Sequence, residues 1–300
     1  YQSGTLYGVQ TEYSVADDKK VSELTYKSGV LISEDYFDDK GNVYLHTEIP
    51  TKALDTLYTN FSNKAIRGKF TYNYGLKNGP FTEYYPNGKV RVKGFYLNGQ
   101  RHDKWVWYHE NGKTESEYNY VCGDIEGIAK NYHENGELQE EKTYDLGVLV
   151  GTEKDYNDKG ILLAEINYLN GKINGKRYFY SEDGNLQLIR HYLNGEIIGY
   201  SYNGKDKKEV AMIATPNETG KVISYFDNGK KAREMNIVKG NFEGEYIEYY
   251  YNGQVHQQQT YKEDELDGIV KTYYPSGKIK KEENYINGYK NGKDVEYYEN

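Results

Sequence analysis

The feature that most constrains this 300-residue chain is a short motif that recurs at a fixed distance. The motif is Tyr-x-x-Asn-Gly or a close variant. Its glycine occurs every 24 residues through the middle of the chain: Gly88, Gly112, Gly136, Gly160 and Gly184. A fixed period of this length is typical of a tandem-repeat architecture, in which each repeat is one small unit that packs on its neighbours.

Other residue types keep the same register. A second tyrosine lies eight residues after each of these turn glycines, and a second glycine lies eleven residues after it. A third glycine lies fifteen residues after each of them except Gly88. The later turn glycines are Gly204, Gly229, Gly253 and Gly277, so one unit is four residues short, the next is one residue long, and the register then resumes. The repeat therefore accounts for most of the 36 tyrosines and 32 glycines as structural residues.

The segments between the turns are predicted to be strands. Val90, Val92 and Tyr96 share one face of their segment, and this period of two indicates a strand with one buried side. Asn-Gly pairs such as Asn87-Gly88 favour the two positive φ angles of a type I′ turn. The second and third glycines are expected to bracket a looser turn, for example over 98–103.

Each unit is therefore predicted to be one β-hairpin. The expected fold is all-β, an elongated, twisted antiparallel β-meander of about twelve hairpin repeats of about 24 residues. Residues 1–63 are expected to hold degenerate N-terminal repeats, and residues 64–300 to hold the regular repeats as one continuous array. In the degenerate part Lys64, Gly41 and Asp18 stand at the turn-glycine position, at steps of 24, 23 and 23 residues.

Two stretches, 47–67 and 205–220, fit the repeat least well. In the first of them an alternative to the strand is a short helix, because four apolar residues are spaced by three and four. These residues are Ala53, Leu57, Tyr58 and Phe61.

The repeat register also reaches both ends of the sequence. Tyr1 and Gly4 fall in the second-tyrosine and glycine columns of a unit whose first half is absent, and Tyr297 and Asn300 begin a motif whose glycine would come next. Because an open edge strand favours aggregation, we expect a fragment of a longer array, or an end that another segment covers.

Charge and composition exclude several function classes. The formal net charge is -8 with acidic and basic residues interspersed, which argues against nucleic acid and anionic membranes as partners. No apolar run approaches the roughly 20 residues of a membrane span, so no membrane insertion is expected. Cys122 is the single cysteine, so no intrachain disulfide forms. The single cysteine does not decide the cellular compartment, and a secreted or cell-surface location is preferred to the cytoplasm.

No residue set predicts catalysis, a cofactor site or a metal site. His109 and His133 occupy one column of neighbouring hairpins, but two strands separate them, which places them roughly 10 Å apart and too far for a shared ion. They are interpreted as solvated turn residues, and Cys122 as an incidental thiol. The chain is therefore predicted not to be an enzyme.

The tyrosine columns have two interpretations. They form the cross-strand core of a one-layer sheet, or they present an aromatic surface to glycans or choline-like cations. The only tryptophans, Trp105 and Trp107, lie in one unit and are followed by Tyr108. These three residues are the candidate ligand or partner patch.

The order of Tyr-x-x-Asn-Gly-Lys, Tyr-x-Asn-Gly and Gly-x-x-x-x-Tyr, as in 84–99 and 274–288, resembles the bacterial variant of MORN repeats. The resemblance is close over 64–300. It implies a sheet of hairpins that acts as an adaptor or scaffold, often with an antitoxin label, and lipid binding in some eukaryotic members. The leading hypothesis is a non-catalytic scaffold that presents a surface to another protein. The alternative is a cell-surface glycan or cell-wall binding module.

Overall fold

The computed structural model describes residues 6–14, 18–61 and 63–299. In this part of the chain the regular structure is antiparallel β-sheet, apart from one short 3₁₀ helix, η1 (Pro216–Glu218). The all-β hairpin fold that the repeat predicts is thereby confirmed. The chain divides into two compact units, Tyr1–Gly136 with Asp145–Gly147 and Glu137–Tyr144 with Val148–Asn300.

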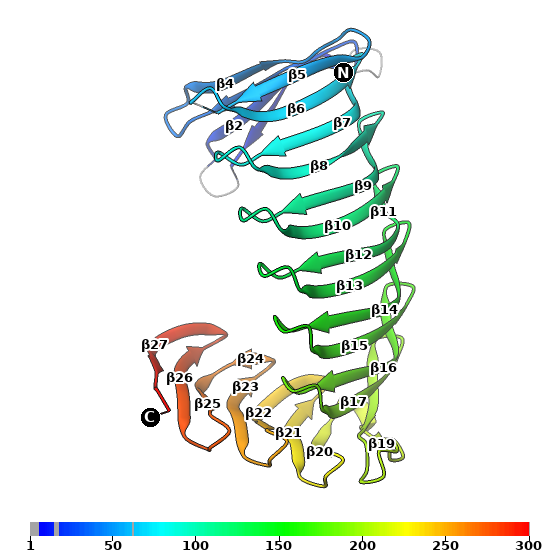
Figure 1. The fold of residues 1–300 in the computed structure, drawn as a ribbon, viewed down its shortest axis with the longest axis vertical. Coiled ribbons are helices and arrows are strands. Elements are labelled where there is room, and N and C mark those ends of the chain that lie inside the picture. The colour runs from blue at the N-terminus through cyan, green and yellow to red at the C-terminus, as the bar shows by residue number, and fades with distance from the viewer. Residues whose placement is uncertain (1–5, 15–17, 62, 300) are drawn as a thin grey trace. The chain divides into compact units, whose positions relative to one another are not determined.

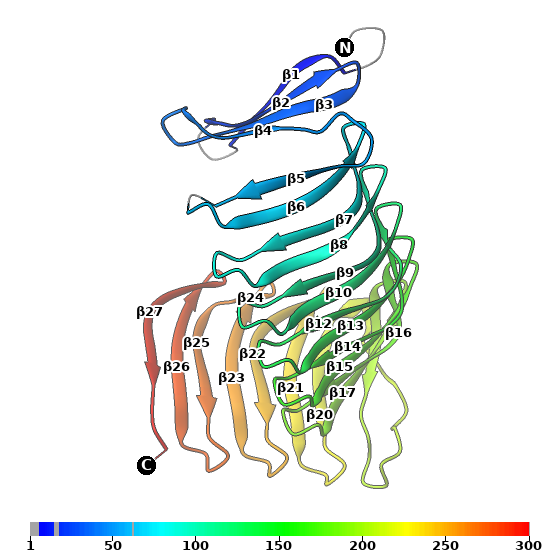
Figure 2. The same ribbon diagram turned by 45° about the horizontal axis from the view of Figure 1, so that its top comes forward.

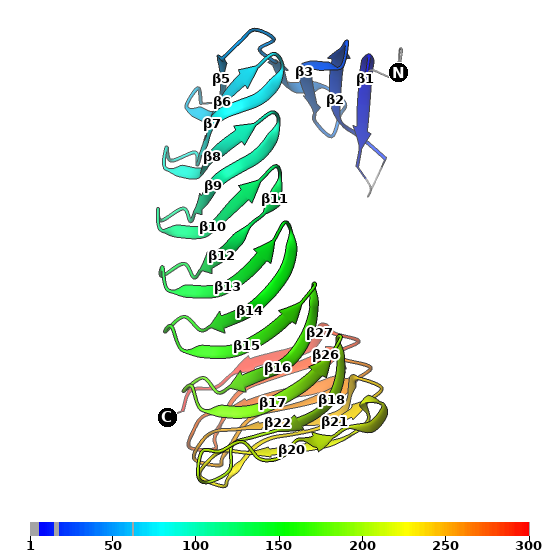
Figure 3. The same ribbon diagram turned by 90° about the vertical axis from the view of Figure 1, so that its right-hand side faces the viewer.

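The first unit holds two runs of strands in which neighbours in sequence pair with each other (Figure 1). One run is a four-stranded sheet of β1 (Gly8–Tyr13), β2 (Lys20–Lys27), β3 (Val30–Phe37) and β4 (Val43–Glu48). The second run consists of β5 (Asp55–Asn60), β6 (Ile66–Asn73), β7 (Leu76–Tyr84), β8 (Val90–Leu97), β9 (Gln100–Tyr108), β10 (Thr114–Val121), β11 (Asp124–Ile125) and β12 (Gly127–Tyr132). The strands of this second run curve along their length (Figure 3).

The second unit continues the same hairpin pattern in two further runs (Figure 2). The first is β13 (Leu138–Asp145), β14 (Val148–Tyr156), β15 (Leu162–Leu169), β16 (Lys172–Tyr180), β17 (Leu186–Leu193), β18 (Glu196–Ser201) and β19 (Ile213–Ala214). The second is β20 (Gly220–Tyr225), β21 (Lys231–Val238), β22 (Asn241–Tyr249), β23 (Val255–Lys262), β24 (Glu265–Leu266), β25 (Gly268–Tyr273), β26 (Ile279–Ile286) and β27 (Tyr289–Glu296). Strand pairing is interrupted between β4 and β5 and between β19 and β20, within the two stretches where the repeat is least regular.

The helix considered for residues 53–61 is wrong, because this segment forms strand β5. Leu57 pairs with Phe70 and Tyr58 with Lys69 of β6, which satisfies the backbone by cross-strand hydrogen bonds. Leu57 is half-buried, whereas Tyr58 is 52% exposed. The alternation of a strand therefore prevails over the spacing of three and four.

The prediction of type I′ turns at the Asn-Gly of the main motif is wrong in detail. The Gly88 N–H donates to the Tyr85 carbonyl at 2.9 Å, and the Tyr85 N–H donates to the Lys89 carbonyl at 2.8 Å. Gly88 has a positive φ of 85°, but Asn87 does not have a positive φ. This geometry is a three-residue loop, a type I turn followed by a glycine bulge. The Asn87 side chain accepts the Lys89 N–H instead.

The type I′ geometry occurs at the second glycine, where a looser turn was expected. Asn98 and Gly99 have φ values of 50° and 85°, and they join Leu97 directly to its partner Gln100. Two residues with positive φ between paired strands define the tight hairpin whose twist matches the sheet. In the repeat of Gly88 the tight type I′ turn and the longer loop therefore lie at the ends opposite to those predicted.

The register predicted for the degenerate repeats is confirmed in the backbone. Lys64 and Asp18, which stand at the glycine position, have positive φ values of 71° and 52°, and Gly41 has 79°. Tyr1, Gly4 and Asn300, on which the prediction about the chain ends rests, lie outside the described residues.

Side chains of one turn bond to the backbone of the turn one repeat later. The Tyr85 hydroxyl donates to the Tyr108 carbonyl at 2.6 Å, and the Lys89 ammonium donates to the Asn111 carbonyl at 3.0 Å. Equivalent bonds join Tyr250 to Tyr273. The lysine that follows Asn-Gly thus fixes the spacing between repeats.

Each unit has its own buried cluster. In the first unit Phe81, Val92, Trp105 and Tyr120 are buried on one face of β7–β10, which we call the aromatic face. In the second unit the cluster joins β17 and β18 to β20, β21 and β22, and its members are Leu188, Tyr200, Val222, Met235, Ile237 and Tyr246. The burial of these rings and aliphatic side chains is the main stabilising contribution.

Candidate functional site

Trp105 is a packing residue at the centre of the aromatic face. Its side chain is 1% exposed, and its indole Nε1–H donates to the Phe95 carbonyl at 3.0 Å. The ring packs against Phe81 and Tyr96 at centroid distances of 5.0 and 4.9 Å, and the Arg101 guanidinium lies 4.7 Å above it. Trp105 would therefore act on a ligand only through these neighbours.

The other two residues of the predicted patch lie on opposite faces of β9. Trp107 is partly buried on the aromatic face, 5.7 Å from Trp105 and 5.3 Å from Tyr118. Tyr108 is the next residue, and its ring lies 5.3 Å from the ammonium of Lys93. Since successive side chains of a strand point to opposite faces, the structure groups Trp107 with Tyr118 rather than with Tyr108.

The opposite face of β6–β12, which we call the polar face, carries a cross-strand ladder. Each member is the direct partner of the next on the neighbouring strand. The members are Lys69, Thr82, Lys93, Val106, Glu117 and Lys130. The Lys69 and Lys93 residues are exposed, and Glu117 is paired with the ammonium of Lys104 at 3.1 Å. The ladder is therefore basic in a chain whose net charge is negative.

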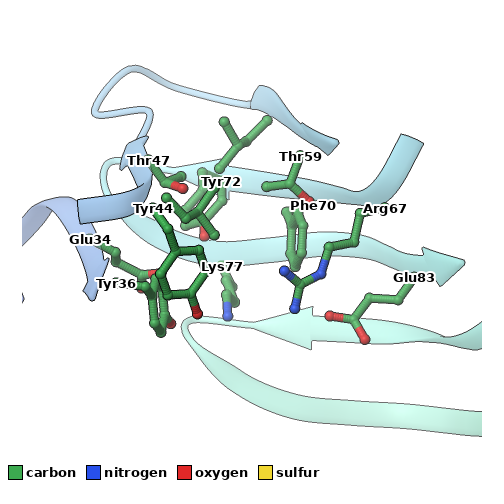
Figure 4. A pocket seen from close by; sticks show the side chains of 12 residues that line it. Glu34, Tyr36, Tyr44, Thr47, Thr59, Arg67, Phe70, Tyr72, Lys77 and Glu83 are labelled. Atoms are coloured by element: carbon green, nitrogen blue, oxygen red, sulfur yellow. The ribbon is translucent and has the colours of Figure 1, made fainter. Parts of the chain in front are cut away.

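A cavity of about 210 Å³ opens beside the aromatic face, between β3–β4 and β5–β7 (Figure 4). Its walls include aromatic rings from both sheets, such as Tyr36 and Phe70. Two cations, Arg67 and Lys77, and two carboxylates, Glu34 and Glu83, also line it. The sequence analysis did not predict this cavity, because it depends on the interruption between β4 and β5.

His109, one of the two histidines of the shared column, bonds to the next repeat. His109 is partly buried, and its Nε2 lies 3.1 Å from the Tyr132 carbonyl one repeat later. The interpretation of His109 as a solvated turn residue is therefore wrong, because its ring holds the same repeat position as Tyr85 and likewise bonds to a backbone carbonyl of the next repeat. Cys122 is an exposed free thiol in the two-residue turn with Gly123.

One group of carboxylates has spacing suitable for a cation. Oxygens of Glu140, Glu153 and Asp155 lie within 4.8 Å of one another. The Lys142 ammonium already supplies positive charge there, at 2.6 Å from Glu140 and 3.8 Å from Glu153. Burial, with the charges of Glu153 and Glu140, raises the pKa of Asp155 to about 6.

The second unit also contains a buried ion pair. The Arg233 guanidinium lies 3.0 Å from the Glu248 carboxylate and donates to the Gln187 side chain at 2.9 Å. Although burial alone would raise the pKa of Glu248, Arg233 and hydrogen bonds hold it at about 2. This pair lies between β17 and β21–β22, so it fixes how these strands pack.

No helix within the described residues is long and apolar enough to cross a bilayer. The fold and these surfaces define a tandem-repeat scaffold. The profile of the MORN repeat variant family matches eight segments, at 77–98, 104–121, 125–146, 149–170, 173–194, 218–239, 242–263 and 266–287. These segments cover more than half of the chain, which therefore belongs to the MORN repeat variant family. That family is generally a non-enzymatic repeat scaffold.

Among solved structures, a crystal structure of TcdB2, TccC3 and Cdc42 contains a chain similar to this one at 13% sequence identity, with a TM-score of 0.16. The similarity covers 91% of this chain and 16% of the length of that chain. No curated protein matches the chain.

Proposed function

We propose that this repeat scaffold docks another protein on the polar face of β6–β12. The observation that supports the proposal is the basic ladder, in which Lys69, Lys93 and Lys130 lie in register on strands of one sheet. With strands about 4.8 Å apart, Lys93 lies roughly 10 Å from Lys69 and roughly 14 Å from Lys130. A rigid row of cations with fixed spacing favours a partner with a matching acidic surface, because charge complementarity accelerates association and fixes register.

The test compares charge reversal on this face with charge reversal elsewhere. The ladder variant carries Lys69→Glu, Lys93→Glu and Lys130→Glu. The matched control carries the same change at three exposed lysines of the second unit, Lys159, Lys172 and Lys262. For a partner captured by the unaltered chain, we expect the ladder variant to lose at least about tenfold in affinity and the control to retain it. Equal affinity in both variants would refute the docking face.

An antitoxin-like role is the specific form of this proposal in a bacterial setting. It is supported by the resemblance of the motif to bacterial MORN-variant repeats, and the partner would then be a toxin. Co-expression should restore growth to cells that make the captured partner, and the ladder variant should fail to restore it. Growth that the ladder variant restores as well as the unaltered chain would contradict this role.

A glycan is the second candidate ligand. It is favoured by the pair of adjacent rings of Trp107 and Tyr118, 5.3 Å apart and only partly buried. Stacking of a sugar on these rings predicts that Trp107→Ala reduces retention on a glycan array. Unchanged retention of both Trp105→Ala and Trp107→Ala on the array would refute a glycan ligand at these rings.

A further inference from the structure

The cavity of Figure 4 contains an arginine, Arg67, that has no carboxylate within ion-pair distance among the described residues. Arg67 stands at the same repeat position as Arg91, three residues after the turn position. Arg91 is paired with Glu83 at 2.7 Å, and His256 and Glu248 occupy the same two columns at 3.8 Å. In the repeat of Arg67 the position that Glu83 holds one repeat later is occupied by Thr59.

The second cation of the cavity also has no carboxylate partner among the described residues. The Lys77 ammonium instead lies over two rings, 5.6 Å from the centroid of Phe70 and 5.5 Å from that of Tyr96. Cations over rings recur in this protein, as with Arg101, which lies 4.7 Å from the ring centroid of Trp105. Glu34 and Glu83 also line the cavity, so it offers both cations and carboxylates, as the two charged groups of a zwitterion require.

The remaining walls restrict the shape of the ligand. Tyr36 and Tyr44 on one side have ring centroids 6.5 Å apart, and Phe70 and Tyr72 lie on the other. Glu34 supplies a carboxylate on the Tyr36 side (Figure 4). At about 210 Å³ the cavity is smaller than the roughly 300–1,000 Å³ of drug-sized sites, so it suits a ligand the size of one amino acid.

We propose that this cavity binds an α-amino acid with an aromatic side chain. Arg67 and Lys77 hold its carboxylate, Glu34 accepts its ammonium group, and the side chain stacks against the aromatic walls. This site is distinct from the polar face, so a small ligand and a docked protein do not compete for the same residues.

The test uses calorimetric titration of the full chain with three probes: phenylalanine, 3-phenylpropionate and 2-phenylethylamine. Phenylalanine should bind with 1:1 stoichiometry, and 2-phenylethylamine should bind at least about tenfold more weakly because it lacks the carboxylate that Arg67 and Lys77 hold. The 3-phenylpropionate probe lacks the ammonium group, so Glu34→Gln should strengthen its binding and weaken that of phenylalanine.

Two further variants test the site without removing a side chain that packs in the cavity wall. Thr59→Glu places a carboxylate at the position that Glu83 holds one repeat later, so it should pair with Arg67 and weaken phenylalanine binding at least about tenfold while the circular dichroism spectrum stays unchanged. Lys40→Gln removes an exposed cation of the turn between β3 and β4, outside the cavity and outside the polar face, and should leave the affinity unchanged. Absence of phenylalanine binding at concentrations of about 1 mM, equal binding of 2-phenylethylamine, or unchanged affinity in Thr59→Glu would overturn the proposal.

Discussion

Gly94→Ala is the substitution that tests the packing of the aromatic face most severely. A Cβ atom at Gly94 would lie 2.3 Å and 2.4 Å from two atoms of the Trp105 indole ring, where ordinary contacts begin at 3.4 Å. The ring would have to move by about 1.1 Å to relieve this overlap. Gly94 itself lacks a positive φ, so its backbone accepts alanine and the effect comes from the ring alone.

The indole ring has little freedom to move. It is enclosed by Phe81, Tyr96, Trp107 and Tyr120 at centroid distances of 4.9 to 6.2 Å, and its N–H is bonded at 3.0 Å. Overpacking of this kind costs about 1–3 kcal/mol, and loss of the indole hydrogen bond adds about 1 kcal/mol. The lower chain entropy of unfolded alanine offsets about 0.4–1 kcal/mol. We therefore expect a net loss of about 1–3.6 kcal/mol.

Urea unfolding followed by tryptophan fluorescence measures this loss. Gly220→Ala is the matched control, because the added Cβ would meet only a Thr215 methyl group at 3.9 Å. It should leave the free energy of unfolding unchanged or raise it by up to about 1 kcal/mol, because only the unfolded-chain entropy changes. In a Trp105→Leu background the Gly94→Ala substitution should lose most of its effect. An equal effect in both backgrounds, or none in the unaltered chain, would refute the reasoning.

Three further perturbations have defined outcomes. Lys64→Gly removes the strain of a positive φ of 71° and should raise the free energy of unfolding in urea by about 0.5–1 kcal/mol. Gly88→Ala should lower it by about 1 kcal/mol, because an alanine at a φ of 85° is strained even though the space around it is open. Lys89→Met removes two bonds to the next turn, so amide hydrogen exchange at residues 109–112 should accelerate while that of β14 stays unchanged. Because the pKa of Asp155 is raised from 3.8 to about 6, its ionisation disfavours the folded state, and stability should fall as the pH rises from about 4 to about 6. Asp155→Asn should remove that fall and be the more stable protein at pH 7.

The sequence predicted the hairpin fold because the repeat is encoded locally. Alternating apolar residues and turn glycines act over a few positions, so Lys64 and Asp18 could be placed at turn positions without a glycine. The assignment of turn types failed because Asn-Gly suits both a type I′ turn and a type I turn with a bulge. The number of residues between the paired strands decides between them.

The cavity and the polar ladder depend on information that is not local. The ladder follows from cross-strand register, which the glycine bulges shift, so the pairing of Lys69 with Thr82 cannot be read from spacing alone. The residues of the cavity come from two separate sheets, so their grouping required the packing of β3–β4 beside β5–β7. The role of Trp105 differs from its prediction because burial is a property of the packed face.

Lysine acetylation rates, measured by mass spectrometry with and without the captured partner, test the central claim that the polar face is the docking surface. The account predicts that Lys69, Lys93 and Lys130 become protected in the complex, while the exposed lysines Lys159 and Lys172 react at unchanged rates. Protection of Lys159 and Lys172 with no change along the ladder would contradict it.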